Sequence, residues 1–314
     1  MNRHPLYGDP RMREVAVPVA TVWTGPAAPR DLDVAAAADL PDPAAWTEAL
    51  DAVTPEEGRL GLHGRSLTQL LLGEPVLVLE EQDGWSHVEA LWQSSARHPD
   101  GYPGWVRSAH LAAPVGTTSG RTACVLDRQA RLRLDEGPAL TVSLGTLLWV
   151  DLVGHGEALV LLPGGRRGSL PLAAVRLGDK ADLPSYDGVR ALETARTFLG
   201  LRYLWGGTSA WGLDCSGLVH LSLRAGGALL PRDAVDQAVA PHVHEVPLDA
   251  VRPGDLYFFA RPGGRIYHVG FVSRPVGEDG VRWMLHAPEG GAIEDAPMAP
   301  ERVPFLVSAG RISS

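Results

Sequence analysis

Short runs in which hydrophobic and polar residues alternate dominate the first half of the chain, and such alternation is typical of β-strands with one buried face. Residues 14–25, EVAVPVATVWTG, show this pattern and are expected to form one strand. Residues 75–91, PVLVLEEQDGWSHVEAL, are expected to form a hairpin, because Asp83 and Gly84 favour a two-residue turn between apolar runs. The chain is therefore predicted to start with a small β-domain.

A stretch rich in Ala, Pro and Asp interrupts this β pattern at about residues 26–60. It contains the sequence PDPAAWTEALD, which is expected to form a short helix that begins at Asp42 or Pro43. The prediction is a first domain over residues 12–113 that carries a helical insertion.

A second group of short strands is expected over residues 117–178, with turns about every 8–12 residues, which is the spacing of a small barrel. The two groups end alike, because GYPGWVRSAHL and RRGSLPLAAVRL are each a Gly-containing strand followed by a short turn that ends in Leu. We interpret the two groups as two small β-barrels that resemble bacterial SH3-type domains.

The pattern changes after a polar linker at residues 178–188. Residues 187–203 have the spacing of an amphipathic helix, whose expected buried face consists of Val189, Leu192, Ala195, Phe198 and Leu199. A second helix is expected from Cys215 to a Gly-Gly pair at residues 226–227. Four strands follow, in DLYFFA, YHVGFVSR, RWMLHAP and PFLVSAGRI. Helices before an antiparallel sheet place residues 187–314 in the α+β class.

The net charge, the apolar runs and the cysteines limit the kinds of molecule that the chain is expected to bind and the compartment in which it is expected to work. The chain has 314 residues and a formal net charge of −9, which argues against a nucleic acid or an anionic membrane surface. No apolar run approaches the roughly 20 residues of a membrane span, and the first residues lack the apolar segment of a signal peptide, so we expect a cytoplasmic protein. Cys124 and Cys215 are expected to form neither a disulfide nor a zinc site, and Cys124 is expected to be a buried strand residue.

The sequence WGLDCSGLVH at residues 211–220 places a cysteine at the start of the second predicted helix. Asp214 can cap that helix, and Cys215 would then lie in its first turn, where the helix dipole and free backbone N–H groups favour negative charge. We expect such a thiol to have a lowered pKa. The same N–H groups can hydrogen-bond the oxyanion that forms when a carbonyl is attacked. Cys215 is therefore the candidate nucleophile.

A cysteine nucleophile needs a base, and the base needs a group that orients it. Among the 11 histidines, His268 lies in the predicted strand RIYHVGFVS, and His286 ends the predicted strand RWMLHAPEGG. Neighbouring strands can bring both imidazoles beside Cys215. His268 would take the thiol proton and later protonate the leaving amine, while His286 would accept the far N–H of His268 and fix its tautomer.

Four motifs occur in order in this part of the chain: Trp-Gly-Gly and Asp-Cys-Ser-Gly in RYLWGGTSAWGLDCSGLV, Pro-Gly-Asp-Leu in VRPGDLYFF, and His-Val-Gly in IYHVGFV. With these motifs the chain resembles the NlpC/P60 cysteine peptidases, a papain-like α+β family, over about residues 187–314. His268 follows Cys215 by 53 residues and His286 follows His268 by 18, which are normal spacings for that family. The resemblance implies a catalytic triad of these three residues, with no cofactor and no metal.

Two SH3-type domains before this domain, with TQLLLGE and GYPGW in the first, make the chain similar to the YkfC-type γ-D-glutamyl-L-diamino-acid endopeptidases, which recycle cell-wall peptides. That similarity implies that the first barrel closes one end of the active-site cleft and that Tyr102 walls the pocket. Asp233, together with Glu74, would pair with the ammonium of a free N-terminal L-Ala, and Trp205 would pack against the alanine. Relatives commonly have Ser after this Asp, whereas this chain has Ala234, which leaves the specificity open.

Several of these residues also have a plain structural interpretation. Tyr102 can belong to the barrel core, Asp233 can cap a helix, and Glu74 can be a solvated turn residue. Tyr203 would line the oxyanion site or only pack under the nucleophile. Ser216 is expected to contact the substrate.

The predicted protein is a monomeric cysteine endopeptidase that cuts the γ-D-Glu–diamino-acid bond of small free muropeptides. The alternatives are an exported wall hydrolase whose barrels bind peptidoglycan, a non-catalytic protein that binds wall peptides, and an acyltransferase or amidase on the same fold. The sequence does not distinguish Lys from diaminopimelate as the diamino acid, and Arg232 and Arg265 are candidate partners for the extra carboxylate.

Overall fold

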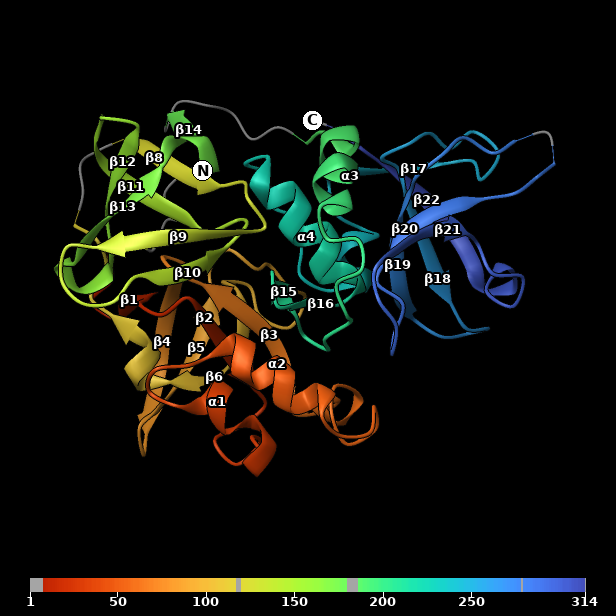
Figure 1. Cartoon of the computed structure of the whole chain (residues 1–314). Coiled ribbons are helices and arrows are strands. Elements are labelled where there is room, and N and C mark those ends of the chain that lie inside the picture. Colours follow the sequence, from red (N-terminus) through yellow and green to blue (C-terminus); the bar gives the residue numbers. More distant parts are fainter. Residues whose placement is uncertain (1–7, 117–119, 180–185, 278, 314) are drawn as a thin grey trace. The chain divides into compact units, whose positions relative to one another are not determined.

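The computed structural model describes residues 8–116, 120–179, 186–277 and 279–313. The chain divides into two compact units, one made of Met1–Leu183 with Trp205–Trp211 and the other of Pro184–Leu204 with Gly212–Ser314. The first unit contains mostly β-strands, whereas the second contains helices and one further large sheet (Figure 1).

The first unit begins with a seven-stranded antiparallel sheet in the order β3-β2-β6-β5-β4-β1-β7 (Figure 1). Its strands are β1 (Met12–Val15), β2 (Val19–Trp23), β3 (Ser66–Leu71), β4 (Pro75–Gln82), β5 (Trp85–Ala90), β6 (Tyr102–Arg107) and β7 (Leu111–Ala112). The predicted hairpin is confirmed as β4 and β5, and its turn residues Asp83 and Gly84 have φ angles of 50° and 78°. Positive φ at both turn residues is typical of the tight turns that match the twist of a hairpin.

The single strand expected over residues 14–25 is wrong, because the chain forms two strands there. β1 pairs with β4 and β7, whereas β2 pairs with β3 and β6. Pro18 lies between them and has no N–H group to donate to a strand ladder. Ala16 instead donates its N–H to the carbonyl of His110 (2.8 Å), and the carbonyl of Pro18 accepts from Leu72 (3.3 Å). The chain therefore changes strand partners at residues 16–18.

The predicted helical insertion is present between β2 and β3. It consists of α1 (Val34–Ala37) and α2 (Pro43–Asp51), with 3-10 turns at Asp31–Asp33 and Leu60–Leu62. The expected start of α2 is confirmed, because the Asp42 carboxylate accepts hydrogen bonds from the N–H groups of Ala44 and Ala45 at 3.0 and 2.9 Å. Asp42 thus satisfies two backbone donors that the first helical turn leaves without an intrahelical acceptor.

A buried carboxylate attaches the insertion to the sheet. The indole N–H of Trp46, on the buried face of α2, donates to Asp33 at 2.9 Å, and the Trp46 ring lies 6.1 Å from that of Trp23 in β2. The guanidinium of Arg30 pairs with the same carboxylate at 2.7 Å. Because Asp33 has both a cation and an indole donor, its charge is compensated although it is fully buried.

The second sheet has the order β10-β9-β13-β12-β11-β8-β14, which repeats the strand order of the first sheet position by position. Its strands are β8 (Arg121–Val125), β9 (Gln129–Leu134), β10 (Leu140–Ser143), β11 (Leu147–Gly154), β12 (Glu157–Leu161), β13 (Arg167–Pro171) and β14 (Val175–Asp179). The last strand of each sheet follows a 3-10 turn, Ser108–His110 in the first and Leu172–Ala174 in the second, and a further 3-10 turn spans Pro163–Gly165. The shared topology supports the interpretation of the two groups as domains of one type.

The cores of these two sheets are joined inside the first unit. Leu72, which follows β3 of the first sheet, is fully buried in the hydrophobic cluster of the second sheet together with residues such as Val125 and Leu148. Cys124 of β8 is buried, as the sequence predicts, and is not part of a disulfide. The two groups of strands therefore share one buried hydrophobic cluster at Leu72.

The second unit consists of helices followed by a six-stranded antiparallel sheet in the order β17-β22-β18-β19-β20-β21. The strands are β17 (Val243–Val246), β18 (Leu256–Ala260), β19 (Ile266–Val272), β20 (Trp283–His286), β21 (Glu294–Pro297) and β22 (Leu306–Ile312), with a 3-10 turn at Val303–Phe305. The helices are α3 (Gly188–Arg196), α4 (Cys215–Ala225) and α5 (Ala234–Gln237); the two-residue strand β16 (Gly212–Leu213) precedes α4, and β15 (Thr208–Ser209) belongs to the first unit. Strands β17 and β21 lie outside the four that the sequence predicts.

The helix predicted over residues 187–203 is partly wrong, because α3 ends at Arg196 and Phe198 and Leu199 lie beyond it. Leu192, Ala195 and Phe198 are buried as expected, but Val189 is 55% exposed and Leu199 is 44% exposed. Ala191 is buried in their place, which centres the apolar stripe between Leu192 and Ala195 and leaves Val189 at its edge.

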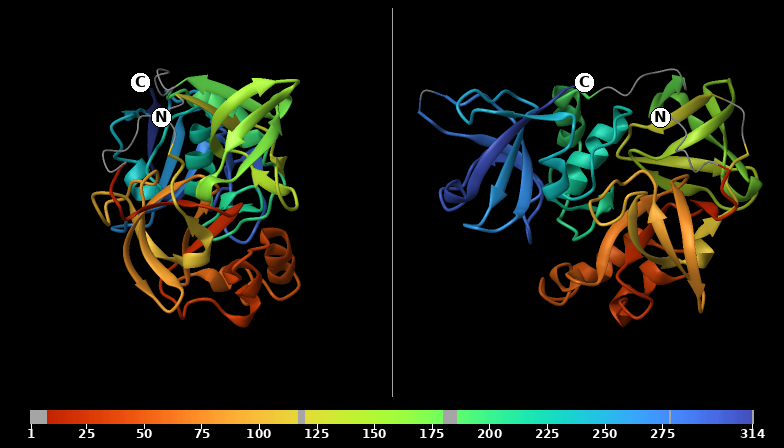
Figure 2. Two further views of the ribbon diagram at one scale, coloured as in Figure 1. Left: turned by 90° about the vertical axis from the view of Figure 1, so that its left-hand side faces the viewer. Right: turned by 180° about the vertical axis from the view of Figure 1, so that it is seen from behind.

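Helix α4 is the element that carries the candidate nucleophile, and all of its 11 residues are buried. It packs against α3 and against β19, and the views in Figures 1 and 2 agree that α3 and α4 lie side by side next to the sheet. The helix is not apolar on every side, because Ser216, His220, Ser222 and Arg224 are buried with it. Nδ1 of His220 lies 2.7 Å from the carbonyl oxygen of Leu230. Within the described part of the chain, no helix has the length and apolar character needed to cross a membrane.

Replacement of Asp42 by alanine removes both hydrogen bonds to the first turn of α2. We expect D42A to lower the free energy of unfolding by about 1 kcal/mol. Urea unfolding followed by tryptophan fluorescence measures the change. The matched control is D42N, which keeps a capping oxygen and is expected to stay close to the wild type; equal destabilisation by both variants would contradict the capping role.

Candidate active site

A buried ion pair fixes the start of α4. The Asp214 carboxylate caps the helix by accepting the N–H of Gly217 at 2.7 Å, as the sequence predicts. Arg232, which is 1% exposed, donates to both oxygens of the same carboxylate at 3.0 and 2.6 Å. Such a bidentate pair holds the two planar groups in one orientation. Arg232 is therefore committed to Asp214 and is no longer a plausible partner for a substrate carboxylate.

The hydroxyl of Ser216 belongs to the same cluster. It donates to Asp214 at 3.2 Å and accepts from Arg232 at 2.9 Å. The side-chain amide of Gln237, on α5, donates to the carbonyls of Ser216 and Pro231 at 3.0 and 2.9 Å. Ser216 thus supports the start of the helix, and its expected contact with the substrate stays a prediction.

Cys215 is the first residue of α4, and 8% of its surface is exposed. Burial raises the pKa of its thiol to about 12, and the charge of Asp214 adds to the rise. Backbone hydrogen bonds from Val269 and Ser216 and the charge of Arg232 lower the pKa, but by less. The expected lowering of the thiol pKa is therefore wrong, because loss of solvent outweighs the field at the helix start. The Val269 contact places the sulfur beside β19.

His268 precedes Val269 in β19 and is buried. Its pKa is lowered well below 6.5, first by burial and then by the neighbouring His286 and the charge of Arg302. The structure brings the two predicted histidines together, because Nε2 of His268 lies 2.9 Å from Nδ1 of His286, with the rings nearly perpendicular at 86°. Burial, followed by Arg302, lowers the pKa of His286 to about 3. Both imidazoles are neutral at pH 7.

Gly270 makes room for this histidine pair. A Cβ atom at Gly270 would lie 2.8 Å from the Cβ of His286 and 2.6 Å from the Cε of Met284. Since real Cβ contacts are longer, any side chain there would push β20 away. The glycine of the His-Val-Gly motif is therefore needed for the approach of His286 to His268.

Tyr203 and Asp233 also lie in the second unit. Tyr203 is buried, and its pKa is raised by burial and then by the charges of Cys215 and Asp214, so its hydroxyl keeps its proton at neutral pH. Asp233 precedes α5 and is half-buried, but its side chain makes no capping hydrogen bond to that helix. Capping of α5 is therefore not the role of the Asp233 carboxylate. Contact of either residue with a substrate stays a prediction.

Trp205 belongs to the first unit, where its segment is hydrogen-bonded to β3. Its indole N–H donates to the carbonyl of Ser66, and the hydroxyl of Ser66 donates to the carbonyl of Trp205, both at 3.1 Å. The Trp205 ring packs against His63 with a centroid distance of 3.7 Å and an angle of 35° between the ring planes. Further along, the hydroxyls of Thr208 and Ser209 donate to Gln69 at 2.7 and 2.9 Å.

Glu74 and Tyr102 lie inside the first domain, each 1% exposed. Glu74 accepts the N–H of Leu71 at 2.8 Å and the amide of Gln93 at 3.3 Å, so it is a buried turn residue rather than a solvated one. Tyr102 belongs to the hydrophobic core of the first sheet, and the guanidinium of Arg97 lies 5.1 Å from its ring centroid. Their predicted contact with a substrate stays a prediction.

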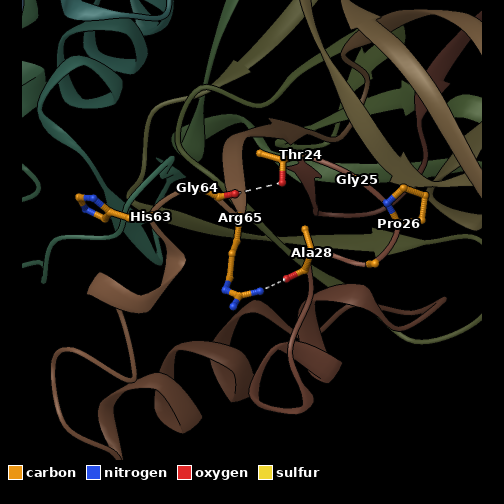
Figure 3. A pocket seen from close by; sticks show the side chains of 8 residues that line it. Thr24, Gly25, Pro26, Ala28, His63, Gly64 and Arg65 are labelled. Atoms are coloured by element: carbon orange, nitrogen blue, oxygen red, sulfur yellow. Dashed lines mark hydrogen bonds between the residues drawn. The ribbon is translucent and has the colours of Figure 1, made fainter.

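A pocket of about 490 Å³ lies in the first unit at the base of the helical insertion (Figure 3). It is lined by Thr24, Gly25, Pro26, Ala27, Ala28, His63, Gly64 and Arg65. Its polar side chains are partly engaged, because Arg65 donates to the carbonyl of Ala28 and Thr24 to the carbonyl of Gly64, both at 3.1 Å. In Figure 3 the His63 ring points away from Arg65, and it is the ring that packs against Trp205.

Two family models and several known proteins match this chain. The model of the NlpC/P60 family matches residues 200–303, and that of the bacterial dipeptidyl-peptidase SH3 domain matches residues 62–111. The chain is 35% identical over 287 residues to a γ-D-glutamyl-L-lysine dipeptidyl-peptidase of Bacillus subtilis, covering 89% of this chain and 91% of that protein. The chain belongs to the NlpC/P60 family.

Two further relatives extend this result. A γ-D-glutamyl-L-lysine dipeptidyl-peptidase of Bacillus cereus is 30% identical over 291 residues, covering 87% of this chain and 82% of that protein. The crystal structure of an NlpC/P60 family protein from Bacillus cereus matches with a TM-score of 0.88 and 28% identity, over 96% of this chain and 100% of that chain. The predictions of an SH3-type domain followed by an NlpC/P60 domain, and of a cysteine peptidase, are confirmed.

The acid limb of kcat/KM for this NlpC/P60 peptidase is expected below pH 6.5. As the predicted base, His268 would have to be neutral to accept the thiol proton, and its lowered pKa keeps it neutral to more acidic pH than a solvated imidazole. Rates of peptide cleavage between about pH 4 and pH 9 measure the limb. A limb centred above pH 6.5 would contradict the lowered pKa of His268 in the free enzyme.

Loss of structure in acid must be separated from protonation of the base. The pKa values of His268 and His286 are lower in the folded protein than in the unfolded chain, so unfolding takes up protons below pH 6.5. Their contribution to stability is present above pH 6.5 and is lost as the pH falls towards the folded pKa values. Circular dichroism at each pH therefore accompanies the rate measurement.

Replacement of Gly270 by alanine in the NlpC/P60 domain is expected to displace His286. We expect G270A to destabilise the protein by about 1–3 kcal/mol, as overpacking of a core does, and to lower kcat. Thermal unfolding and kcat measure the two effects. G154A is the matched control, because a Cβ at Gly154 of β11 meets no atom within 4 Å. Wild-type kcat in G270A would contradict the need for this close approach.

Proposed function

We propose that this enzyme hydrolyses the γ-D-glutamyl–L-diamino-acid bond of small muropeptides that begin with a free L-Ala. The observation that carries the proposal is the contact of the Cys215 sulfur with the backbone of Val269 in β19. Val269 follows His268, the proposed base, whose Nε2 atom lies 2.9 Å from Nδ1 of His286. The substrate class is supported by the Bacillus relatives, which are named γ-D-glutamyl-L-lysine dipeptidyl-peptidases and align over nearly the whole chain. The proposed product is the dipeptide L-Ala-D-Glu.

The first half of the reaction forms a thioester. The Cys215 sulfur attacks the γ-carbonyl carbon of D-Glu while its proton passes to Nδ1 of His268, since Nε2 of that ring faces His286. The carbonyl electrons move to the oxygen, and the N–H of Cys215 and the protonated hydroxyl of Tyr203 are the proposed donors to this oxyanion. The carbon–nitrogen bond then breaks, and the proton on His268 passes to the leaving amine.

The second half restores the enzyme. A water molecule attacks the thioester carbon, and His268 takes one of its protons. The carbon–sulfur bond breaks, the γ-carboxyl group of the dipeptide is released, and the proton returns to the sulfur. Because His268 acts as base and acid in turn, a resting neutral imidazole suits both halves.

Recognition of a free amine is assigned to Asp233. A carboxylate in a partly dry site binds an ammonium through charge-assisted hydrogen bonds worth about 1.5–3 kcal/mol. Asp233 immediately precedes α5 and is half-buried, which suits a carboxylate in a partly dry site. A blocked substrate amine would leave the carboxylate without its cation, so peptides still attached to glycan would be poor substrates.

The proposed setting is recycling of wall peptides in the cytoplasm by a monomer. Neither cysteine is part of a disulfide, which suits a reducing compartment and a thiol nucleophile at Cys215. The acidic net charge of −9 supports a small peptide partner rather than a nucleic acid or an anionic membrane.

Cleavage of L-Ala-γ-D-Glu-diaminopimelate, followed by mass spectrometry of the products, tests the proposal. The free peptide is expected to yield L-Ala-D-Glu, and the N-acetylated peptide is expected to react at least about tenfold more slowly. The corresponding Lys peptide, run in parallel, ranks the two diamino acids. Equal rates for the free and acetylated peptides would contradict recognition of the amine.

Two variants assign the roles. C215A is expected to abolish cleavage, and full activity in C215A would exclude the nucleophile. D233N is expected to raise KM for the free peptide and to leave the slow reaction of the acetylated peptide unchanged. Transfer of the dipeptide to an added amine in place of water would favour the acyltransferase alternative, and binding without cleavage would favour the non-catalytic one.

A further inference from the structure

A carboxylate that the sequence analysis did not single out continues the histidine pair. Glu294 lies in β21 directly opposite His286 of β20 in the strand register. Its Oε1 atom is 3.2 Å from Nε2 of His286, and its side chain is 53% exposed. Nδ1 of the same His286 ring faces Nε2 of His268. The three side chains therefore form one hydrogen-bonded row that ends at His268.

The carboxylate of Glu294 determines which atom donates and which accepts in each hydrogen bond of this row. An ionised carboxylate only accepts hydrogen bonds, so Nε2 of His286 must carry the proton that it donates to Glu294. A neutral imidazole has one N–H, and burial keeps His286 neutral, so Nδ1 of His286 is an acceptor. Nε2 of His268 must then donate to it. His268 is neutral as well, so its Nδ1 atom is left as the unprotonated nitrogen.

We propose that Glu294 is a positioning residue that selects the Nε2–H tautomer of both His286 and His268 and thereby leaves Nδ1 of His268 free to accept a proton. The inference deepens the proposed function, on which it rests for the identity of His268 as the base. Glu294 touches neither the substrate nor the sulfur in this scheme, and it acts only through His286.

Loss of the acceptor at position 294 would release the choice of tautomer. His286 could then carry its proton on Nδ1 and donate to Nε2 of His268, which would move the proton of a neutral His268 onto Nδ1. In that form His268 cannot accept the proton of Cys215. A wrong histidine tautomer in a serine-protease triad lowers kcat about 10⁴-fold, so even partial population of this form gives a measurable loss.

The test combines kinetics with nitrogen-15 NMR of histidine side chains, which distinguishes Nδ1–H from Nε2–H tautomers. The wild type is expected to show Nε2–H at both His268 and His286. E294A is expected to show a mixture at both rings and a kcat lowered by at least about tenfold with little change in KM. E294Q, whose amide oxygen can still accept the N–H of His286, is expected to recover most of kcat.

A variant that places a hydrogen-bond donor at position 294 is expected to shift the tautomers in the opposite direction. In E294K the ammonium can only donate, so it is expected to favour the Nδ1–H tautomer of His286 and to lower kcat more than E294A does. The matched control is D295N at the neighbouring residue of β21, whose carboxylate lies 3.7 Å from Arg196 instead. It is expected to change neither the tautomers nor kcat.

The outcomes separate this inference from the proposed function. Wild-type histidine spectra and wild-type kcat in both E294A and E294K would overturn the role of Glu294. An enzyme that fails to cleave the muropeptides would leave the NMR readout intact, because the tautomers are measured without substrate. A merely structural role would lower thermal stability in E294A without altering the tautomers, and that result would also overturn the proposal.

Discussion

The candidate active site depends on the buried ion pair between Asp214 and Arg232, because this pair holds the backbone from which Cys215 projects. Asp214 caps α4, receives two hydrogen bonds from Arg232 and adds to the rise in the thiol pKa. Removal of one partner from such a pair leaves an uncompensated buried charge and commonly costs about 3–5 kcal/mol. The same two side chains thus stabilise the helix start and adjust the pKa of a thiol that burial raises most.

Burial has opposite effects on the acidities of the two reacting groups, and both effects favour the neutral forms. It raises the pKa of Cys215 and lowers that of His268, so a resting thiolate–imidazolium pair is disfavoured on both sides. In the proposed reaction, proton transfer is therefore best coupled to the attack on the carbonyl, when the developing charge lies on the oxyanion rather than on the sulfur. The free N–H groups at the start of α4 then stabilise the charge at the place where it arises.

The sequence predicts features that depend on neighbouring residues and fails where distant ones decide. The Asp42 and Asp214 caps and the Asp83-Gly84 turn are local, and each is found as expected. The predicted direction of the Cys215 pKa shift was wrong, because the shift depends on how deeply the helix start is buried. Local sequence spacing does not reveal that depth.

The partners of the site show the same limit. Glu294 reaches His286 only through the register of β20 and β21, and β21 has a weak strand pattern. Arg232 was considered for a substrate carboxylate, but its pairing with Asp214 needs the fold. The histidine pair was predictable because its motif and spacing resemble a family, whereas the atoms that face each other, Nε2 and Nδ1, come only from the structure.

The segment that leads to the nucleophile serves both units of the chain. Residues 205–211 are bonded to β3 of the first unit, through Ser66 and Gln69, and the next residues begin the second unit and α4. Within the eleven residues from Trp205 to Cys215, the first seven must therefore fit the hydrogen bonds of β3, and the last four must fit the start of α4. A catalytic unit cut away from the first SH3-type domain would lose the partners of Trp205, Thr208 and Ser209, and the buried polar groups of this segment would need new ones.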